Sequence, residues 1–147
     1  MRHPAPLLTL ILLIAFVSAA QETKPAPKTV ISPVPVKAAR EPNPVKSTPE
    51  SIAEGKKIYS YDCATCHGVS GDGKTEAAKD LKMIPDLSDP IFQRDRTDGE
   101  FFYVVKNGHG DMPPEGDRAK PEQIWDLVNY VRSLARKQSP ADQKPST

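Results

Sequence analysis

The sequence predicts an all-α fold for one small domain. Three segments carry apolar residues at the three- and four-residue spacing of a helix face, and each begins near a helix-start signal. No stretch shows the alternating pattern of a half-buried strand, and we find no internal repeat. At 147 residues the chain provides at most one ordinary domain, and its two ends reduce the length that folds.

The first twenty residues predict an export signal. An apolar run from Leu7 to Val17 is followed by the small residues Ser18-Ala19-Ala20, which suit a signal peptidase. An uncleaved membrane anchor is the alternative, although the run is shorter than the ~20 residues that cross a bilayer as a helix. We therefore expect cleavage after residue 20 and export to the periplasm.

Residues 21–48 are predicted to form a flexible, proline-rich linker. Each proline removes an amide donor and disfavours helix in the residue before it, so we expect an extended segment without a packed element. The linker carries five basic and two acidic residues, and it suits either a docking arm or a leader without a partner. Residues 49–138 are predicted to form the folded domain, and residues 139–147 a disordered tail. The domain has thirteen basic and sixteen acidic residues, which argues against nucleic-acid binding.

The first helix is predicted from Pro49 to about Asp62. Thr48 is a suitable N-cap residue, and Pro49 suits the first helical position. Gly55 falls on the apolar face of this helix, where a glycine costs ~1 kcal/mol relative to alanine. We expect another element to cross so closely at Gly55 that no side chain fits.

Two more helices complete the predicted domain. Thr97-Asp98-Gly99-Glu100 indicates a capping box, and the helix that it opens should end at Gly108 in a left-handed conformation. The third helix is expected from Pro121 to about Lys137. Shorter helical turns are predicted over residues 75–81 and after Asp89-Pro90.

The segment Cys63-Ala-Thr-Cys66-His67 holds both cysteines of the chain. A disulfide between them would close too short a loop to stabilise much, and a thioredoxin-like redox pair would need a βαβ setting. A zinc site would need a fourth ligand, for which His109 is a candidate. The same spacing is the signature of covalent haem attachment, in which the two thiols bind one edge of the porphyrin and the histidine binds the iron. We favour haem, because it also adds apolar mass to a thin core.

The chain resembles the class I, bacterial-type monohaem cytochromes c. The similarity covers about residues 49–137, through "GKKIYSYDCATCHGVSGDG", "VVKNGHGDMPP" and "IWDLVNYVRSL". It implies a small all-α fold around one haem c, with Gly55 and Tyr59 packed against Leu127 and Tyr130. The family commonly has a proline soon after the haem motif, whose carbonyl fixes the histidine ring. This sequence lacks it, so the hydrogen-bond partner of His67 is open.

The second axial iron ligand is predicted to be Met112. Glycines and prolines surround it, where no helix face could bury it as ordinary core, and the family delivers its distal methionine from a similar segment. His109 and Met83 are the alternatives.

The resemblance implies an electron carrier rather than an enzyme. Histidine–methionine ligation fills both axial positions of the iron, which suits one-electron transfer with a redox partner such as a respiratory complex, an oxidase or a dehydrogenase. The protein could act as a free carrier or as a subunit of a larger complex. The alternative is a haem protein that binds a small ligand after displacement of Met112, as a sensor or an enzyme.

Overall fold

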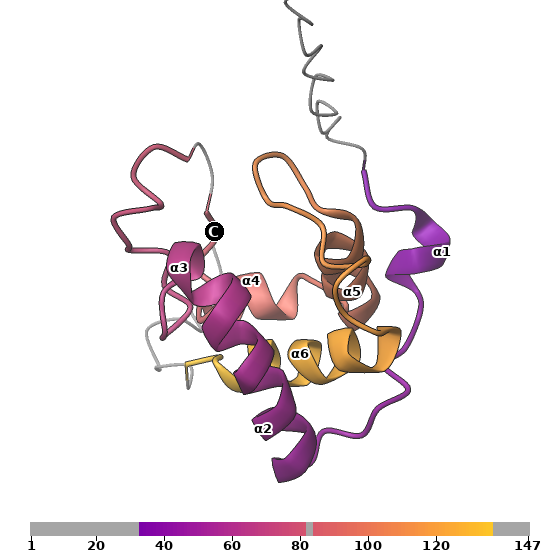
Figure 1. Cartoon of the computed structure of the whole chain (residues 1–147). Coiled ribbons are helices and arrows are strands. Elements are labelled where there is room, and N and C mark those ends of the chain that lie inside the picture. Colours follow the sequence, from indigo (N-terminus) through magenta and orange to yellow (C-terminus); the bar gives the residue numbers. More distant parts are fainter. Residues whose placement is uncertain (1–32, 82–83, 137–147) are drawn as a thin grey trace, which may run out of the picture.

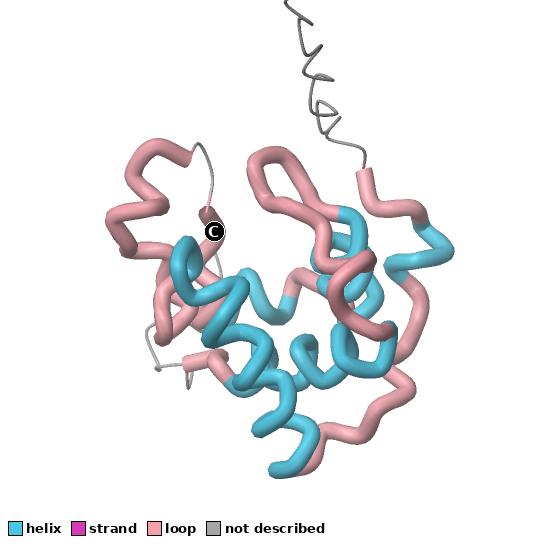
Figure 2. The backbone as a smooth tube through the Cα atoms, viewed as in Figure 1, coloured by secondary structure: helices cyan, strands magenta, loops and turns pink. Residues whose placement is uncertain are grey.

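The computed structural model describes residues 33–81 and 84–136, and the predicted all-α fold is confirmed (Figure 1). Over these residues, regular structure consists of helices and one isolated bridge, joined by long loops (Figure 2). The elements are α1 (Val36–Ala39), α2 (Pro49–Ile58), the π-helical turn η1 (Tyr59–Cys63), α3 (Ala64–His67), α4 (Pro90–Arg94), α5 (Asp98–Asn107) and α6 (Pro121–Ser133).

The first predicted helix begins as expected but does not stay α-helical to Asp62. The Thr48 hydroxyl accepts a hydrogen bond from the Ser51 N–H at 3.2 Å, and Pro49 occupies the first turn. α2 ends at Ile58, and the chain continues through the wider turn η1. A pattern of apolar residues at helical spacing cannot distinguish an α-helix from one that carries a single π turn.

The other two main helices are α5 and α6. The Thr97 hydroxyl accepts from the Glu100 N–H at 3.1 Å, and the Glu100 carboxylate accepts from the Thr97 N–H at 2.7 Å, which is the predicted capping box. Gly108 follows α5 with φ 76° and ψ 166°, so its φ is positive but its ψ is extended rather than left-handed helical. α6 ends at Ser133, short of the expected end near Lys137, which lies outside the described residues.

The shorter predicted elements are present as well. Hydrogen bonds from Ala78 N–H to the Thr75 carbonyl and from Leu81 N–H to the Ala78 carbonyl form successive turns. The Asp89 side chain accepts from the Ile91 N–H at 2.8 Å and caps α4.

The crossing of α2 and α6 is the most extensive contact between elements (Figure 1). A Cβ on Gly55 would overlap the Asp126 carbonyl group and lie 2.9 Å from the Leu127 Cα, so only glycine allows this approach. Tyr59 packs against Tyr130 with ring centroids 5.0 Å apart. The predicted contact between Gly55 and Tyr59 on one helix and Leu127 and Tyr130 on the other is therefore confirmed.

One hydrophobic core joins this crossing to the rest of the domain. Tyr59, Ile124 and Leu127 are each 1% exposed, and full burial of an aliphatic side chain contributes about 1.5–3 kcal/mol. α5 adds Val105 to the core and stacks Phe102 on Trp125, with ring centroids 4.1 Å apart.

The segment before α2 corrects the expectation of an extended linker without packed elements. Residues 36–39 form α1, which packs on the start of α5. The Thr97 hydroxyl donates to the Ala39 carbonyl at 2.6 Å, and a Cβ on Gly99 would overlap the Ala38 carbonyl oxygen. The prolines at 35 and 42 flank this turn rather than interrupt it, so residues 36–41 keep their amide donors.

We call residues 36–45 the N-terminal arm. The second half of this arm binds α6. The Asn43 side-chain amide donates to the Trp125 carbonyl at 3.2 Å and to the Asn129 side chain at 2.9 Å. The Asn129 amide in turn donates to the Val45 carbonyl at 3.1 Å and to the Ser51 hydroxyl at 2.7 Å. This part of the predicted linker is thus held against the domain.

Several predicted segments lie outside the described residues. They are the export signal at 1–20, the first part of the linker at 21–32, Met83, and the tail at 139–147. Among residues 33–81 and 84–136, no helix has the length and apolar character needed to cross a membrane.

Candidate haem site

Cys63, Cys66 and His67 lie on one continuous helical segment. Cys63 is the last residue of η1, and the other two belong to α3. Both cysteines are free thiols, Cys63 buried and Cys66 partly exposed, so the structure does not link them in a disulfide. Three residues correspond to about one helical turn, which is the separation that two attachment points on one porphyrin edge require.

The π turn sets the direction in which this motif faces. The Ala64 N–H donates to the Tyr59 carbonyl, five residues back rather than four. The extra residue in the turn rotates α3 relative to α2. Cys63, the last residue of this turn, is buried, while its neighbour Asp62 is exposed.

Hydrogen bonds fix the backbone around His67. The Gly73 N–H donates to the His67 carbonyl at 2.9 Å, which closes the loop after the motif. The buried Tyr59 hydroxyl donates to the Gly68 carbonyl at 2.7 Å and ties the same loop to η1. Burial of the Tyr59 ring raises the pKa of its hydroxyl well above its usual value, so Tyr59 remains a neutral donor.

The His67 side chain is buried, and one of its ring nitrogens lacks a hydrogen-bond partner. It is 8% exposed, and its Nδ1 has no hydrogen-bond partner among the described residues. A buried polar atom without a partner costs free energy. When the other ring nitrogen binds a metal, this nitrogen is the one that a carbonyl normally fixes. Burial lowers the pKa of His67, which keeps the imidazole neutral, the form that binds metals. The partner that the missing proline would have supplied is not replaced by another carbonyl in the described structure.

The buried surroundings of Cys63 disfavour its thiolate form. Burial, and then the charge of Glu115, raises the pKa of Cys63 to about 12. The protonated thiol is therefore the favoured form of Cys63 in the haem-free chain.

The loop after α5 positions Met112. Its N–H donates to the His109 carbonyl at 3.0 Å, and the His109 N–H donates to the Met112 carbonyl at 3.1 Å, so Gly110 and Asp111 form a tight turn. Gly110 has φ 59°, a value that glycine adopts without strain. A Cβ on Gly108 would lie 3.0 Å from the Pro114 nitrogen, so the start of the loop also needs a glycine.

Met112 and His109 differ in their surroundings. Met112 is partly buried and packs against the core cluster that contains Tyr59 and Cys63. His109 is exposed at the turn. Met112 stays a predicted ligand with His109 as its alternative, while Met83 lies outside the described residues.

One buried charge was missed by the sequence analysis. Glu115 is 4% exposed, and its carboxylate pairs with Arg118. Its N–H donates to the Val105 carbonyl at 2.9 Å, which anchors the loop to α5. No local pattern singles out this glutamate, since its burial depends on how the loop folds against a distant helix.

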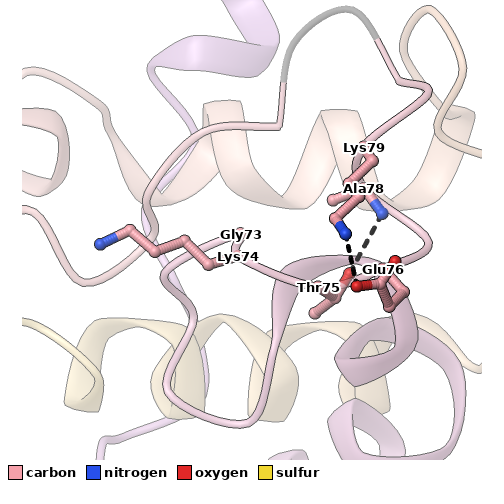
Figure 3. A pocket seen from close by; sticks show the side chains of 6 residues that line it. All are labelled: Gly73, Lys74, Thr75, Glu76, Ala78 and Lys79. Carbon is pink, nitrogen blue, oxygen red and sulfur yellow. Dashed lines mark hydrogen bonds and ion pairs between the residues drawn. The ribbon is translucent and has the colours of Figure 1, made fainter.

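A shallow hollow lies at the loop that follows the haem motif (Figure 3). It has a volume of about 390 Å³ and is formed by the loop at 73–79. The Thr75 hydroxyl donates to the Cys66 carbonyl at 3.1 Å and accepts from the Ala78 N–H. Lys79 is engaged with Glu76 at 2.5 Å, whereas the Lys74 side chain extends away from this pair in Figure 3. The hollow contains none of the predicted haem ligands.

The zinc alternative receives no support from the described residues. Between residues 33 and 136, apart from 82 and 83, no three His, Cys, Asp or Glu side chains are grouped so that they could hold a metal ion. The residue set at the motif therefore fits haem better than zinc, because a haem brings its own four nitrogen ligands and needs only axial donors from the chain.

The fold and this motif define a small c-type cytochrome domain, and comparison with known families agrees. A family model described as cytochrome C oxidase, cbb3-type, subunit III matches residues 50–131, which is more than half of the chain. The chain therefore belongs to this family. Membership implies haem c as the cofactor.

Relatives of several kinds share the domain. A cytochrome c6 from Cladophora glomerata is 35% identical over 86 residues, which are 58% of this chain and 91% of the relative. The cbb3-type cytochrome c oxidase subunit FixPc from Rhizobium leguminosarum bv. viciae is 33% identical over 89 residues, 60% of this chain and 29% of the subunit. The quinohemoprotein alcohol dehydrogenase ADH IIB from Pseudomonas putida is 33% identical over 108 residues, but the chain spans only 14% of its length.

A solved structure has the same small fold. The KustC0563 c-type cytochrome superposes with a TM-score of 0.52 and 29% identity, covering 56% of this chain and 98% of that one. The match thus extends over nearly the whole of a c-type cytochrome, while it covers about half of the present chain.

Proposed function

We propose that this protein is an exported electron carrier that holds one haem c. Cys63 and Cys66 hold it through two thioether bonds, and His67 and Met112 are its axial iron ligands. The observation that carries the proposal is the motif itself: two free thiols one helical turn apart, followed at once by a buried histidine. The position of Met112, partly buried against the core, supports its place in the ligand set.

Each of these residues has a separate task. A bound haem supplies an iron that alternates between ferric and ferrous states, and histidine–methionine ligation raises its reduction potential relative to bis-histidine ligation. The two cysteines would hold the ring on the helical segment, and the loop from Gly108 would supply the Met112 thioether as a ligand to the iron. The core around Tyr59 and Leu127 excludes water from the contact between the helices.

The protein acts as a carrier, or as a subunit of a larger oxidoreductase, rather than as an enzyme. Two protein ligands on the iron leave no axial position for a substrate. The relatives named as cytochrome c6 and as cbb3-type oxidase subunits support this assignment.

The proposed location is the periplasm, and the proposed partner is another redox protein. The predicted export signal at 1–20 supports export, since c-type haem attachment takes place outside the bacterial cytoplasm. Similarity to oxidase subunits supports a respiratory oxidase as one partner, alongside a dehydrogenase as electron donor. If the signal stays uncleaved, it tethers the domain to the membrane.

Covalent attachment is tested by producing the chain with a c-type haem maturation system. The wild-type protein should keep its haem after denaturation and acid–acetone extraction, and its intact mass should exceed that of the polypeptide by one haem. Cys63→Ala with Cys66→Ala should release the haem, whereas Tyr61→Ala, at a side chain 83% exposed, should not. Complete extraction of haem from the wild type would contradict the proposal.

A further inference from the structure

Three charged side chains join the two segments that hold the proposed haem ligands. Glu115 lies three residues after Met112, and Asp62 immediately precedes Cys63. Arg118 connects them: its guanidinium pairs with the Glu115 carboxylate, and its Nη1 lies 3.9 Å from the Asp62 Oδ1.

The three groups differ sharply in their contact with water. The side chain of Glu115 is 5% exposed, whereas those of Arg118 and Asp62 are 56% and 37% exposed. Water and salt screen a charge at the surface, but they screen a buried charge much less. The negative charge of Glu115 therefore acts on its interior surroundings more strongly than the partly exposed charges do.

The field of this carboxylate reaches the haem attachment point. After burial, the charge of Glu115 is the largest cause that raises the pKa of Cys63, and Arg118 acts in the opposite direction. Independently, the contact of Arg118 with Asp62 places the ion group beside the residue that precedes this cysteine. Two carboxylates and one guanidinium leave the group with a net negative charge next to the motif.

We propose that the Glu115–Arg118 pair sets the reduction potential of the haem, with the buried carboxylate lowering it and the guanidinium raising it. The inference rests on the proposed electron-carrier function. Ferric haem has one more positive charge than ferrous haem, so a nearby negative charge favours the ferric state and a nearby positive charge favours the ferrous state. The reaction concerned is the addition of one electron from an external redox mediator to ferric haem, without bond breaking.

Potentiometric titration of the haem-loaded full chain with redox mediators tests this proposal. Glu115→Gln keeps the shape of the side chain and removes its charge, so it should shift the one-electron equilibrium toward ferrous haem by at least about threefold, or ~28 mV upward at 59 mV per tenfold. Arg118→Gln should shift the potential downward. Arg118→Lys keeps the positive charge and should stay nearer to the wild type than Arg118→Gln.

Glu54→Gln is the matched control. Glu54 also forms an ion pair with a basic residue three positions later, Lys57, at 2.6 Å, but its side chain is 58% exposed on α2. The same change of charge at this place should leave the potential unchanged, because water and salt screen it.

A purely structural role predicts a different pattern. Loss of either partner breaks the link between the Met112 loop and the Cys63 turn. Both variants would then shift the potential in the same direction. Both would also weaken the charge-transfer absorption that a methionine–iron bond gives in the ferric protein. Opposite shifts with unchanged absorption support the proposal, and shifts in one direction, or no shift in Glu115→Gln, overturn it. If the proposed function itself were wrong, the wild type would show no covalent haem or no reversible one-electron titration, so the two failures are distinguishable.

Discussion

At the scale of single residues, the choice of axial ligand depends on two side chains on one tight turn. Met112 and His109 pair through two backbone hydrogen bonds across Gly110 and Asp111. Met112 packs against the core, whereas His109 is exposed. A haem with a thioether ligand and a haem with a second imidazole ligand differ in reduction potential and in absorption spectrum. Measurement of either property therefore separates Met112 from His109 as the ligand.

Met112→Ala should remove the methionine–iron charge-transfer absorption of the ferric protein. It should also lower the reduction potential, by about 59 mV or more, which is a tenfold change in the one-electron equilibrium. Absorption spectroscopy with potentiometric titration measures both. His109→Ala is the control from the same turn and should resemble the wild type. A wild-type spectrum in Met112→Ala, or loss of the absorption in His109→Ala, would show that the ligand is misassigned.

Residues differ in how far sequence alone predicts their role. Cys63, Cys66 and His67 could be proposed from the sequence because their chemistry depends on short-range spacing along one helical segment. Glu115 could not, since its burial arises from a backbone hydrogen bond to Val105 on α5 and from a loop that folds back on that helix. Composition and periodicity contain no information about such a contact.

At the scale of elements, the crossing of α2 and α6 organises the domain. Gly55 lets the two backbones approach, and Tyr59 on the next turn packs on Tyr130. Tyr59 also bonds the Gly68 carbonyl, so the crossing is connected directly to the loop after the haem motif. A change at the crossing should therefore affect stability first and haem surroundings second.

Gly55→Ala should destabilise the protein by about 1–3 kcal/mol, because the added methyl group overlaps the backbone of α6. Helix propensity alone predicts the opposite sign, a gain of ~1 kcal/mol. Denaturant unfolding of the haem-loaded protein measures the difference. Lys56→Ala changes an exposed neighbour on the same helix and should have little effect. A more stable Gly55→Ala variant would mean that the close contact does not constrain this position.

The helices also show which features the spacing of apolar residues can predict and which it cannot. The starts of α2 and α5 could be predicted because capping residues act locally, and both caps are present. The π turn could not, since the same apolar spacing fits a continuous α-helix.

At the scale of the whole molecule, the fold is a small helical core against which the N-terminal arm is held. The N-terminal arm crosses α5 and α6 and is fixed by Thr97, Asn43 and Asn129. Sequence reasoning predicted an all-α domain but treated this segment as an extended linker, because proline content describes local backbone preference only. The three polar anchors lie far apart in the sequence, and only the folded chain brings them together.

The central claim is that this domain carries a covalent haem with both axial positions filled by the protein. The most direct test is the absorption spectrum of the haem-loaded protein when oxidised, reduced, and reduced under carbon monoxide. We predict a low-spin spectrum in both oxidation states and no change on addition of carbon monoxide, because His67 and Met112 occupy the iron. A clear spectral shift with carbon monoxide would contradict this account and would indicate a site that binds small ligands.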